Sequence, residues 1–288
     1  MPELPEVETV RRGLEPAMVG KTIKKVHLSR PDLRFPFPDH FARTLEGHKI
    51  LSLTRRAKYL LAELDNQQIL VMHLGMSGSF RIEDKPVGQF HHQRGKSPTH
   101  DHVIFILEGD KQIVYNDPRR FGFMLLIPQN DIAQHKLFRK IGIEPLGNSL
   151  DGSQLTTLFR AKKVNLKTAL LDQTLICGLG NIYVCEALFK SGLSPKRKAA
   201  TLNGRTILAR ERAERLAHSI REVLTQAVAA GGSSLRDHRQ ADGSLGYFQH
   251  HFQVYDREGE ACPNKCGCKI KRIVQSGRST FYCAHCQK

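Results

Sequence analysis

The chain has 288 residues, 40% hydrophobic and 25% charged, which is the balance of an ordinary globular protein with room for two packed domains. No apolar run approaches the length of a membrane span, and the N-terminus lacks the basic and apolar regions of a signal peptide. We therefore expect a cytoplasmic protein without a membrane partner. The formal net charge of +16 favours a partner made of phosphates.

The chain opens with Met-Pro-Glu-Leu-Pro-Glu-Val-Glu-Thr. Removal of Met1 would leave Pro2 with a free secondary amine, and Glu3 places a carboxylic acid beside it. A secondary amine attacks an aldehyde-like carbon to give an iminium, whose positive charge draws electrons from neighbouring bonds. Most proteins with proline at position 2 make no use of it, so this interpretation depends on the rest of the chain.

Helical periodicity appears first, from about Pro5 to Met18. Between Lys21 and Pro128 the pattern changes to short strands separated by turn residues. The expected strands are 22–29, 50–53, 59–64, 69–74, 102–107, 112–116 and 123–127. Short strands without long helices between them predict a β-sandwich or a barrel-like domain.

Helical patterns replace the strands in the second half, at 154–160, 166–173, 181–190 and 205–229. Asn181 follows Gly178-Leu-Gly180 and is placed to cap the helix 181–190, whose first N–H groups form an anion site. Gly231-Gly232 ends the longest helix, and the polar stretch 233–249 is expected to be a mobile loop. The residues of the longest helix expected to face the core are Ile207, Leu208, Leu216, Ile220, Val223, Leu224 and Val228.

Five of the seven cysteines lie in the last 27 residues, around strands expected at 269–275 and 278–282. In a reducing cytosol this indicates metal binding rather than disulfides. The pairs Cys262/Cys266 and Cys283/Cys286 supply four thiolates for one structural zinc ion, and such a closed shell activates no water. Cys268 is an alternative to Cys262 or Cys266, and His285 is a weaker alternative ligand.

Several motifs together carry a resemblance that spans nearly the whole chain. The opening MPELPEVETVRRGL, Lys58, the segments 73–78, 116–122 and 178–183, and the cysteine cluster resemble bacterial formamidopyrimidine-DNA glycosylases. The C-x3-C spacing of the first cysteine pair departs from the C-x2-C that such proteins usually have. The resemblance implies an α+β multidomain fold. Its expected parts are an N-terminal catalytic β-sandwich domain with a leading helix (1–135), a linker (136–152), a helix-two-turns-helix domain with a lesion-lid loop (153–250) and a zinc finger (251–288).

The resemblance also implies a monomeric enzyme that excises 8-oxoguanine and formamidopyrimidines from damaged double-stranded DNA and then cleaves the abasic site by β,δ-elimination. Pro2 would form the Schiff base and Glu3 would act as general acid, while Lys58 and Arg278 would contact phosphates and support catalysis. The implied DNA contacts are His73, Met76, Arg119, Arg120, Phe121 and Asn181. The implied lesion pocket comprises Glu6, Ser233, Leu235, Arg236, Asp237 and His238.

Plainer interpretations exist for several of these residues. Lys58 would be an ordinary surface lysine, Met76 and Phe121 would be core residues, and Asn181 would be only a helix cap. Two other functions also fit the chain. An enzyme of the endonuclease VIII type has the same fold but acts on oxidised pyrimidines, and the continuation Leu4–Thr9 favours the purine branch. A non-enzymatic zinc-ribbon protein would bind nucleic acid without needing Pro2 beside Glu3. We expect the protein to associate with the nucleoid when it acts.

Overall fold

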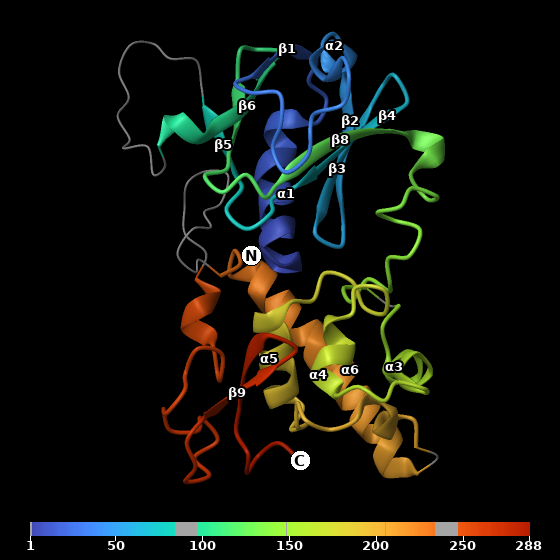
Figure 1. Cartoon of the computed structure of the whole chain (residues 1–288), viewed down its shortest axis with the longest axis vertical. Coiled ribbons are helices and arrows are strands. Elements are labelled where there is room, and N and C mark those ends of the chain that lie inside the picture. Colours follow the sequence, from blue (N-terminus) through green and yellow to red (C-terminus); the bar gives the residue numbers. More distant parts are fainter. Residues whose placement is uncertain (1, 84–96, 148, 205, 234–246) are drawn as a thin grey trace. The chain divides into compact units, whose positions relative to one another are not determined.

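The computed structural model describes residues 2–83, 97–147, 149–204, 206–233 and 247–288 (Figure 1). The chain divides into two compact units, which we call the first and second unit. The first comprises Met1–Arg139 and Ala230–Gln249, and the second comprises Lys140–Ala229 and His250–Lys288. No helix in the described ranges is long and apolar enough to cross a membrane.

The first unit contains two antiparallel four-stranded sheets and the helix α1 (Leu4–Met18) (Figure 1). One sheet has the order β1–β6–β7–β5, with β1 (Ile23–Leu28), β5 (Ser79–Glu83), β6 (Asp101–Leu107) and β7 (Gln112–Asn116). The other has the order β2–β3–β4–β8, with β2 (Ile50–Arg56), β3 (Tyr59–Leu64), β4 (Gln68–His73) and β8 (Phe123–Pro128). Three short helices lie between strands or after them: α2 (Phe41–Leu45), η1 (Pro98–His100) and η2 (Gln129–Asp131).

The core of the first unit forms between α1 and both sheets. Val7, Val10 and Leu14 recur at helical spacing and are buried, and they belong to the same apolar cluster as Leu60 and Phe105 from the two sheets. The helix contacts β2 and β3 of one sheet and β5 of the other. The predicted leading helix and β-sandwich are therefore confirmed, and α1 is fixed to this core.

In the described residues, the second unit contains four α-helices and a β-hairpin. The helices are α3 (Gly152–Phe159), α4 (Leu166–Leu171), α5 (Asn181–Lys190) and α6 (Ile207–Ala229), and the hairpin strands are β9 (Lys271–Gln275) and β10 (Arg278–Tyr282). The short 3-10 helix η3 (Ala199–Leu202) also belongs to this unit, and η4 (Phe248–His251) begins in the first unit and ends in the second.

The expected core face of α6 was wrong at its first turn. Ile207 is 74% exposed and Leu208 is 51% exposed, whereas Ala209 begins the buried stripe that continues through Ala213 and Leu216. Successive helical residues are turned by about 100°, so Ile207 points about 200° away from Ala209. We had predicted these two side chains to be in the core because they are apolar. Their positions around the helix axis instead direct them to solvent.

The hairpin and α5 share one small core. Cys185 and Phe189 of α5 pack with Val254, Ile270 and Phe281 from the C-terminal segment. The buried carboxylate of Glu186 accepts hydrogen bonds from the backbone N–H groups of residues 253, 254 and 255 at 2.9, 3.0 and 2.8 Å. Burial raises the pKa of Glu186, and these three donors oppose the rise. These contacts explain why the cysteine module and the helices form one compact unit.

Candidate active site

The N-terminus of α1 brings two carboxylic acids next to Pro2. Pro2, Glu3 and Glu6 are all buried. The Glu6 carboxylate accepts the backbone N–H of Glu3 at 2.8 Å, an arrangement typical of a capping box at a helix start. The first turn of the helix therefore fixes the backbone of Glu3, and with it the direction in which this acid leaves the chain.

The second oxygen of Glu6 binds Ser233, the residue after the glycine pair that ends α6. It accepts the Ser233 backbone N–H at 2.8 Å and the Ser233 hydroxyl at 3.0 Å. Gly232 has φ +77°, and a Cβ there would lie 3.2 Å from Cγ of Glu6, so the left-handed backbone and the close approach both favour glycine. The structure thus places Ser233 against Glu6, while Leu235, Arg236, Asp237 and His238 lie outside the described residues.

Lys58 lies in the tight turn between β2 and β3, after Ala57 with φ +53°. Its side chain is buried, which differs from an ordinary surface lysine. Arg55 holds this turn to α1: its Nε donates to Glu8 at 3.2 Å, and its Nη1 donates to the carbonyl of Ala57 at 2.8 Å. We did not identify Arg55 and Glu8 from the sequence. In the sequence, Glu8 is only an acidic residue on the polar face of the predicted helix, and Arg55 is one of a run of basic residues far along the chain.

His73 ends β4 and lies in an aromatic cluster. Its ring stacks on Phe123 with centroids 5.1 Å apart and lies 5.1 Å from Tyr59. Its Nδ1 accepts the backbone N–H of Gly75 at 3.0 Å, so the proton of the neutral ring is on Nε2. Burial, followed by the positive charges of Lys58 and Arg34, lowers the pKa of His73 to about 4. His73 is therefore a neutral N–H donor near pH 7.

Met76 and Phe121 are exposed at the tips of two loops, one after β4 and one between β7 and β8. Their exposed fractions are 38% and 43%, so neither is a core residue. Arg119 lies on the same tip, with its guanidinium 4.8 Å from the centroid of the Phe121 ring, in cation–π contact. Arg120 also lies on this turn and has φ +56°.

Asp117 joins the two tip loops, and we did not predict it from the sequence. Its carboxylate accepts hydrogen bonds from the Ser77 hydroxyl, from the Gly122 N–H at 2.8 Å and from the Tyr115 hydroxyl at 3.2 Å. The Ser77 hydroxyl in turn accepts the Arg119 N–H at 3.2 Å. Asp117 is fully buried, so these donors set one geometry for both loops.

The backbones of these loops also touch directly at glycine. A Cβ at Gly75, which has φ +63°, would lie 2.3 Å from the nitrogen of Gly122 and from the carbonyl carbon of Phe121. A Cβ at Gly122 would lie 1.8 Å from the Tyr115 hydroxyl. The loops that carry Met76 and Phe121 therefore form one rigid pair of tips.

In the second unit, Asn181 is not the cap of α5 that we expected. The helix begins at Asn181 and its N-cap residue is Gly180, because the extended backbone that a cap requires falls one residue earlier. The Asn181 amide donates instead to the carbonyl of Ser279 at 2.9 Å, beside Arg278 at the start of β10. The structure thus brings Asn181 and Arg278 close together.

Lys167 supports the same place from α4. It is fully buried, and its Nζ donates to the Ser279 carbonyl at 2.8 Å and to the Thr280 hydroxyl at 2.6 Å. A buried lysine is rare unless its charge is paired or hydrogen-bonded. We did not identify Lys167 from the sequence, where its only signal was a charge within the apolar run 164–171.

Cys262, Cys266, Cys283 and Cys286 converge, with all four sulfur atoms within 4.8 Å of one another. The Sγ–Sγ distances are 3.8 Å for Cys262–Cys286 and 3.5 Å for Cys266–Cys283. Tetrahedral zinc with Zn–S bonds of about 2.3 Å requires sulfur separations of about 3.8 Å, so this group fits one structural zinc ion. Cys268 lies outside the group and contributes its backbone carbonyl, which accepts the Cys262 N–H at 2.9 Å.

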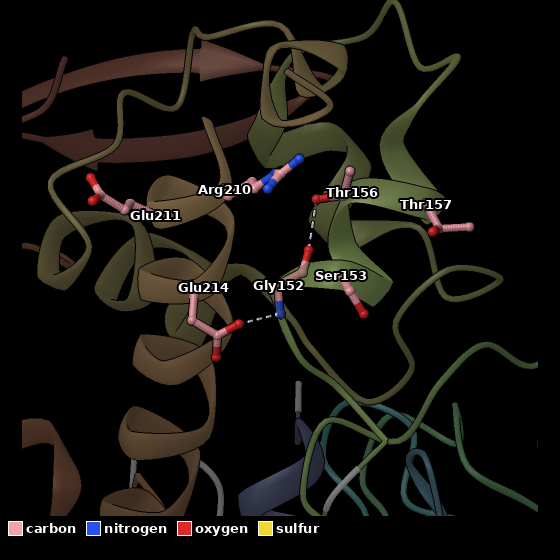
Figure 2. A pocket seen from close by; sticks show the side chains of 7 residues that line it. All are labelled: Gly152, Ser153, Thr156, Thr157, Arg210, Glu211 and Glu214. Carbon is pink, nitrogen blue, oxygen red and sulfur yellow. Dashed lines mark hydrogen bonds between the residues drawn. The ribbon is translucent and has the colours of Figure 1, made fainter. Parts of the chain in front are cut away.

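A cavity of about 540 Å³ lies between α3 and α6 (Figure 2). None of the predicted site residues lines it. Its Glu214 accepts the Gly152 N–H at 2.8 Å, and a Cβ at Gly152 would lie 2.7 Å from the Glu214 nitrogen. Figure 2 shows the Glu214 side chain of α6 bonded to the backbone nitrogen of Gly152 at the start of α3. The Glu214 carboxylate thus helps to pack α6 against α3.

Three family models match successive parts of the chain. They are the formamidopyrimidine-DNA glycosylase N-terminal domain at residues 1–124, the formamidopyrimidine-DNA glycosylase H2TH domain at 141–239, and a zinc finger found in FPG and IleRS at 259–288. The formamidopyrimidine-DNA glycosylases of Beijerinckia indica subsp. indica and Methylocella silvestris are 65% and 61% identical to the chain, over the full length of both partners.

Solved structures give the same relationship. The MutM (Fpg) protein of Thermus thermophilus is 40% identical, with a TM-score of 0.82 over 99% of this chain and 98% of that one. A Lactococcus lactis Fpg bound to DNA that contains an abasic site is 34% identical, with a TM-score of 0.84 over 99% of each chain. Sequence, domain order and fold agree over the whole length, and the chain belongs to the formamidopyrimidine-DNA glycosylase family.

Proposed function

We propose that the protein is a bifunctional DNA glycosylase and abasic-site lyase that removes oxidised purines, including 8-oxoguanine and formamidopyrimidines, from duplex DNA in base excision repair. The observation that carries this proposal is the buried pair of acids, Glu3 and Glu6, held beside Pro2 at the start of α1. Its support from the relatives is that Lactococcus lactis Fpg was solved with DNA containing Fapy-dG and with DNA containing an abasic site.

In this proposal, Pro2 is the nucleophile once Met1 has been removed, because its nitrogen is then an amine rather than an amide. The amine attacks C1′ of the damaged nucleotide, the bond from C1′ to the purine breaks, and the proton that the amine loses balances the one that the leaving purine takes up. Glu3 protonates the ring oxygen as the bond from C1′ to that oxygen opens, which leaves an iminium between Pro2 and C1′. The resulting iminium draws electrons from the sugar, so C2′ loses a proton and the bond from C3′ to its phosphate breaks. A second elimination breaks the bond from C5′ to phosphate and leaves a one-nucleotide gap.

The remaining candidate residues divide between positioning and binding. Glu6 fixes the backbone of Glu3 and holds Ser233, and the two belong to a lesion pocket completed by residues 235–238. Lys58 and His73 of the first unit, and Asn181 and Arg278 of the second, contact phosphates. Met76, Arg119 and Phe121 fill the gap that the flipped nucleotide leaves, with Arg119 facing the opposite base and Arg120 supporting a backbone contact.

The proposed organisation keeps the catalytic β-sandwich at 1–135, a linker at 136–152, the helix-two-turns-helix domain at 153–250 and the zinc finger at 251–288. The zinc stabilises the hairpin that presents Arg278 and takes no part in bond breaking, because four thiolates leave no open coordination position. The protein acts as a monomer on damaged chromosomal DNA in the bacterial cytoplasm, and it associates with the nucleoid while it acts.

The test compares Glu3→Gln with Glu15→Gln, since Glu15 lies on the same helix but is half-exposed and pairs with Arg11. Single-turnover excision from a duplex with 8-oxoguanine opposite cytosine is expected to fall by about 100-fold or more in Glu3→Gln, the usual contribution of a general acid. It should be unchanged in Glu15→Gln. Equal excision by both variants would contradict the role of Glu3, and a wild-type protein that prefers thymine glycol would move the substrate to pyrimidines.

A further inference from the structure

The loop between β1 and α2 ends in an exposed tip formed by Arg34 and Phe35. Leu33 before the tip is buried in the core. Its N–H donates to the Phe35 carbonyl at 3.0 Å, and the Phe37 N–H donates to the Pro31 carbonyl at 3.0 Å. The loop is therefore closed on itself below the tip, and the two side chains at positions 34 and 35 are presented by a folded support.

The tip is attached to the loop that carries Phe121. The Arg34 N–H donates to the Gly122 carbonyl at 3.1 Å, and in Figure 1 the loop leading from β1 to α2 reaches the segment entering β8. The Phe35 ring meets Phe123 edge to face, with centroids 5.5 Å apart, and Phe123 stacks on His73. Phe35 is nevertheless 47% exposed, so one side of its ring is packed and the other is open.

In the described part of the chain, the Arg34 guanidinium forms no ion pair. Its guanidinium has no carboxylate partner there and lies 5.5 Å from the Phe35 ring centroid. Arg30, four residues earlier, pairs with Asp32 at 2.6 Å, and Arg55 pairs with Glu8 at 3.2 Å. The positive charge of Arg34 also reaches its neighbours: it adds to the lowering of the His73 pKa by burial and by Lys58, and it opposes the rise that burial causes in the Tyr59 pKa.

A guanidinium without a carboxylate partner in the described residues, beside a half-open aromatic ring, fits one kind of ligand well. A nucleic-acid backbone offers a phosphate for the guanidinium and the apolar side of a deoxyribose for the ring. The neighbouring tip already carries Phe121 and Arg119, for which we propose DNA contact. The patch is thus continuous with a surface of the same chemistry, and the net charge of +16 matches such a partner.

We propose that Arg34 and Phe35 form a further DNA contact: the guanidinium binds one backbone phosphate, and the ring packs on the adjacent sugar, next to the gap filled by Met76 and Phe121. This proposal rests on the proposed function, because it extends the same DNA surface. Its role is binding, so it predicts changes in affinity and in the dependence of that affinity on salt.

The test is equilibrium binding to a duplex with a tetrahydrofuran abasic analogue, measured over a range of salt concentrations. Arg34→Gln is expected to make the slope of log K against log salt shallower by about 0.9, because one phosphate contact and its released counterions are lost. If the variant and wild type bind equally at 1 M salt, this difference in slope makes binding by the variant about fivefold weaker at physiological salt. Arg34→Lys should retain the wild-type slope. Phe35→Leu should weaken binding at every salt concentration without changing the slope.

The control is Arg43→Gln, which removes another exposed arginine of the first unit, from α2. It should retain the wild-type slope. The single-turnover excision rate of Arg43→Gln at saturating protein should also equal that of wild type. An unchanged slope in Arg34→Gln, or an equal loss in Arg43→Gln, would overturn the contact while leaving the proposed function intact. A wild-type protein that neither binds the duplex nor excises 8-oxoguanine would instead contradict the proposed function.

Discussion

Gly75→Ala tests whether the two tip loops act as one rigid wedge. Gly75 has φ +63°, so any other residue costs about 1–2 kcal/mol in this left-handed conformation. The added Cβ would also lie 2.3 Å from backbone atoms of Phe121 and Gly122, which cannot rotate away as a side chain can. Overpacking of this kind costs about 1–3 kcal/mol more, and the loops can relieve it only by moving apart.

Gly109→Ala is the matched control, because Gly109 has φ +85° and a Cβ there meets nothing within 4 Å. Both variants should be destabilised by the left-handed backbone conformation. Only Gly75→Ala should also be destabilised by the clash of its Cβ with neighbouring backbone. A loss of about 1.4 kcal/mol in the transition state is about tenfold in rate. We therefore expect single-turnover excision from a duplex to fall by about tenfold or more in Gly75→Ala and to stay near wild type in Gly109→Ala.

The assay pairs excision with the fluorescence of 2-aminopurine placed beside the lesion, which reports unstacking when the wedge enters. Urea unfolding of both variants separates stability from function. Gly75→Ala should give a smaller fluorescence change, while Schiff-base trapping on single-stranded abasic DNA stays as in wild type. Equal excision and equal fluorescence in the two variants would refute the rigid wedge. If Gly75→Ala does not fold, Ser77→Ala removes the hydroxyl that joins the loops without any backbone clash.

Three further predictions follow from particular contacts. The pKa of His73 is lowered from 6.5 to about 4, so the unfolded chain binds a proton more readily than the folded protein. The free energy of unfolding should therefore be highest above pH 6.5. It should fall by on the order of 3 kcal/mol as the pH drops toward about 4. His73→Gln should lose less in urea unfolding over that window, and a loss equal to wild type would exclude His73 as the source. Glu6→Gln should be destabilised by about 1–3 kcal/mol and should excise more slowly, because an amide has one oxygen and cannot accept hydrogen bonds at both ends from Glu3 and Ser233. Excision equal to that of Glu15→Gln would contradict this role of Glu6. Chelation of zinc should abolish DNA binding before the first unit unfolds, and normal affinity of the chelated protein would show that the hairpin is not needed.

Most regular elements followed from local patterns. The strands at 59–64 and 112–116 and the helix at 181–190 begin and end where the sequence predicts, because apolar spacing and turn residues mark them. The strand β5 and the helix α2 were missed. Arg81 of β5 interrupts the apolar pattern and pairs with Asp101 of the neighbouring strand, and α2 is only five residues long.

The candidate site was predicted less evenly. The sequence alone suggested a reactive amine at Pro2 beside Glu3, but the resemblance supplied its assignment and all the DNA-contact residues, because no local pattern distinguishes Phe121 from an ordinary residue. The residues that hold them came only from the structure. Asp117 reaches Ser77 across 40 positions and Glu6 reaches Ser233 across 227, so these contacts depend on how the chain folds back and leave no periodic signal.

Borohydride trapping shows whether Pro2 forms the Schiff base. The protein without Met1 is incubated with a duplex carrying 8-oxoguanine opposite cytosine in the presence of sodium borohydride, and the product is digested and mapped by mass. We expect a covalent adduct on Pro2. An adduct on a lysine, or no adduct with either this duplex or an abasic duplex, would contradict the Schiff-base mechanism on Pro2.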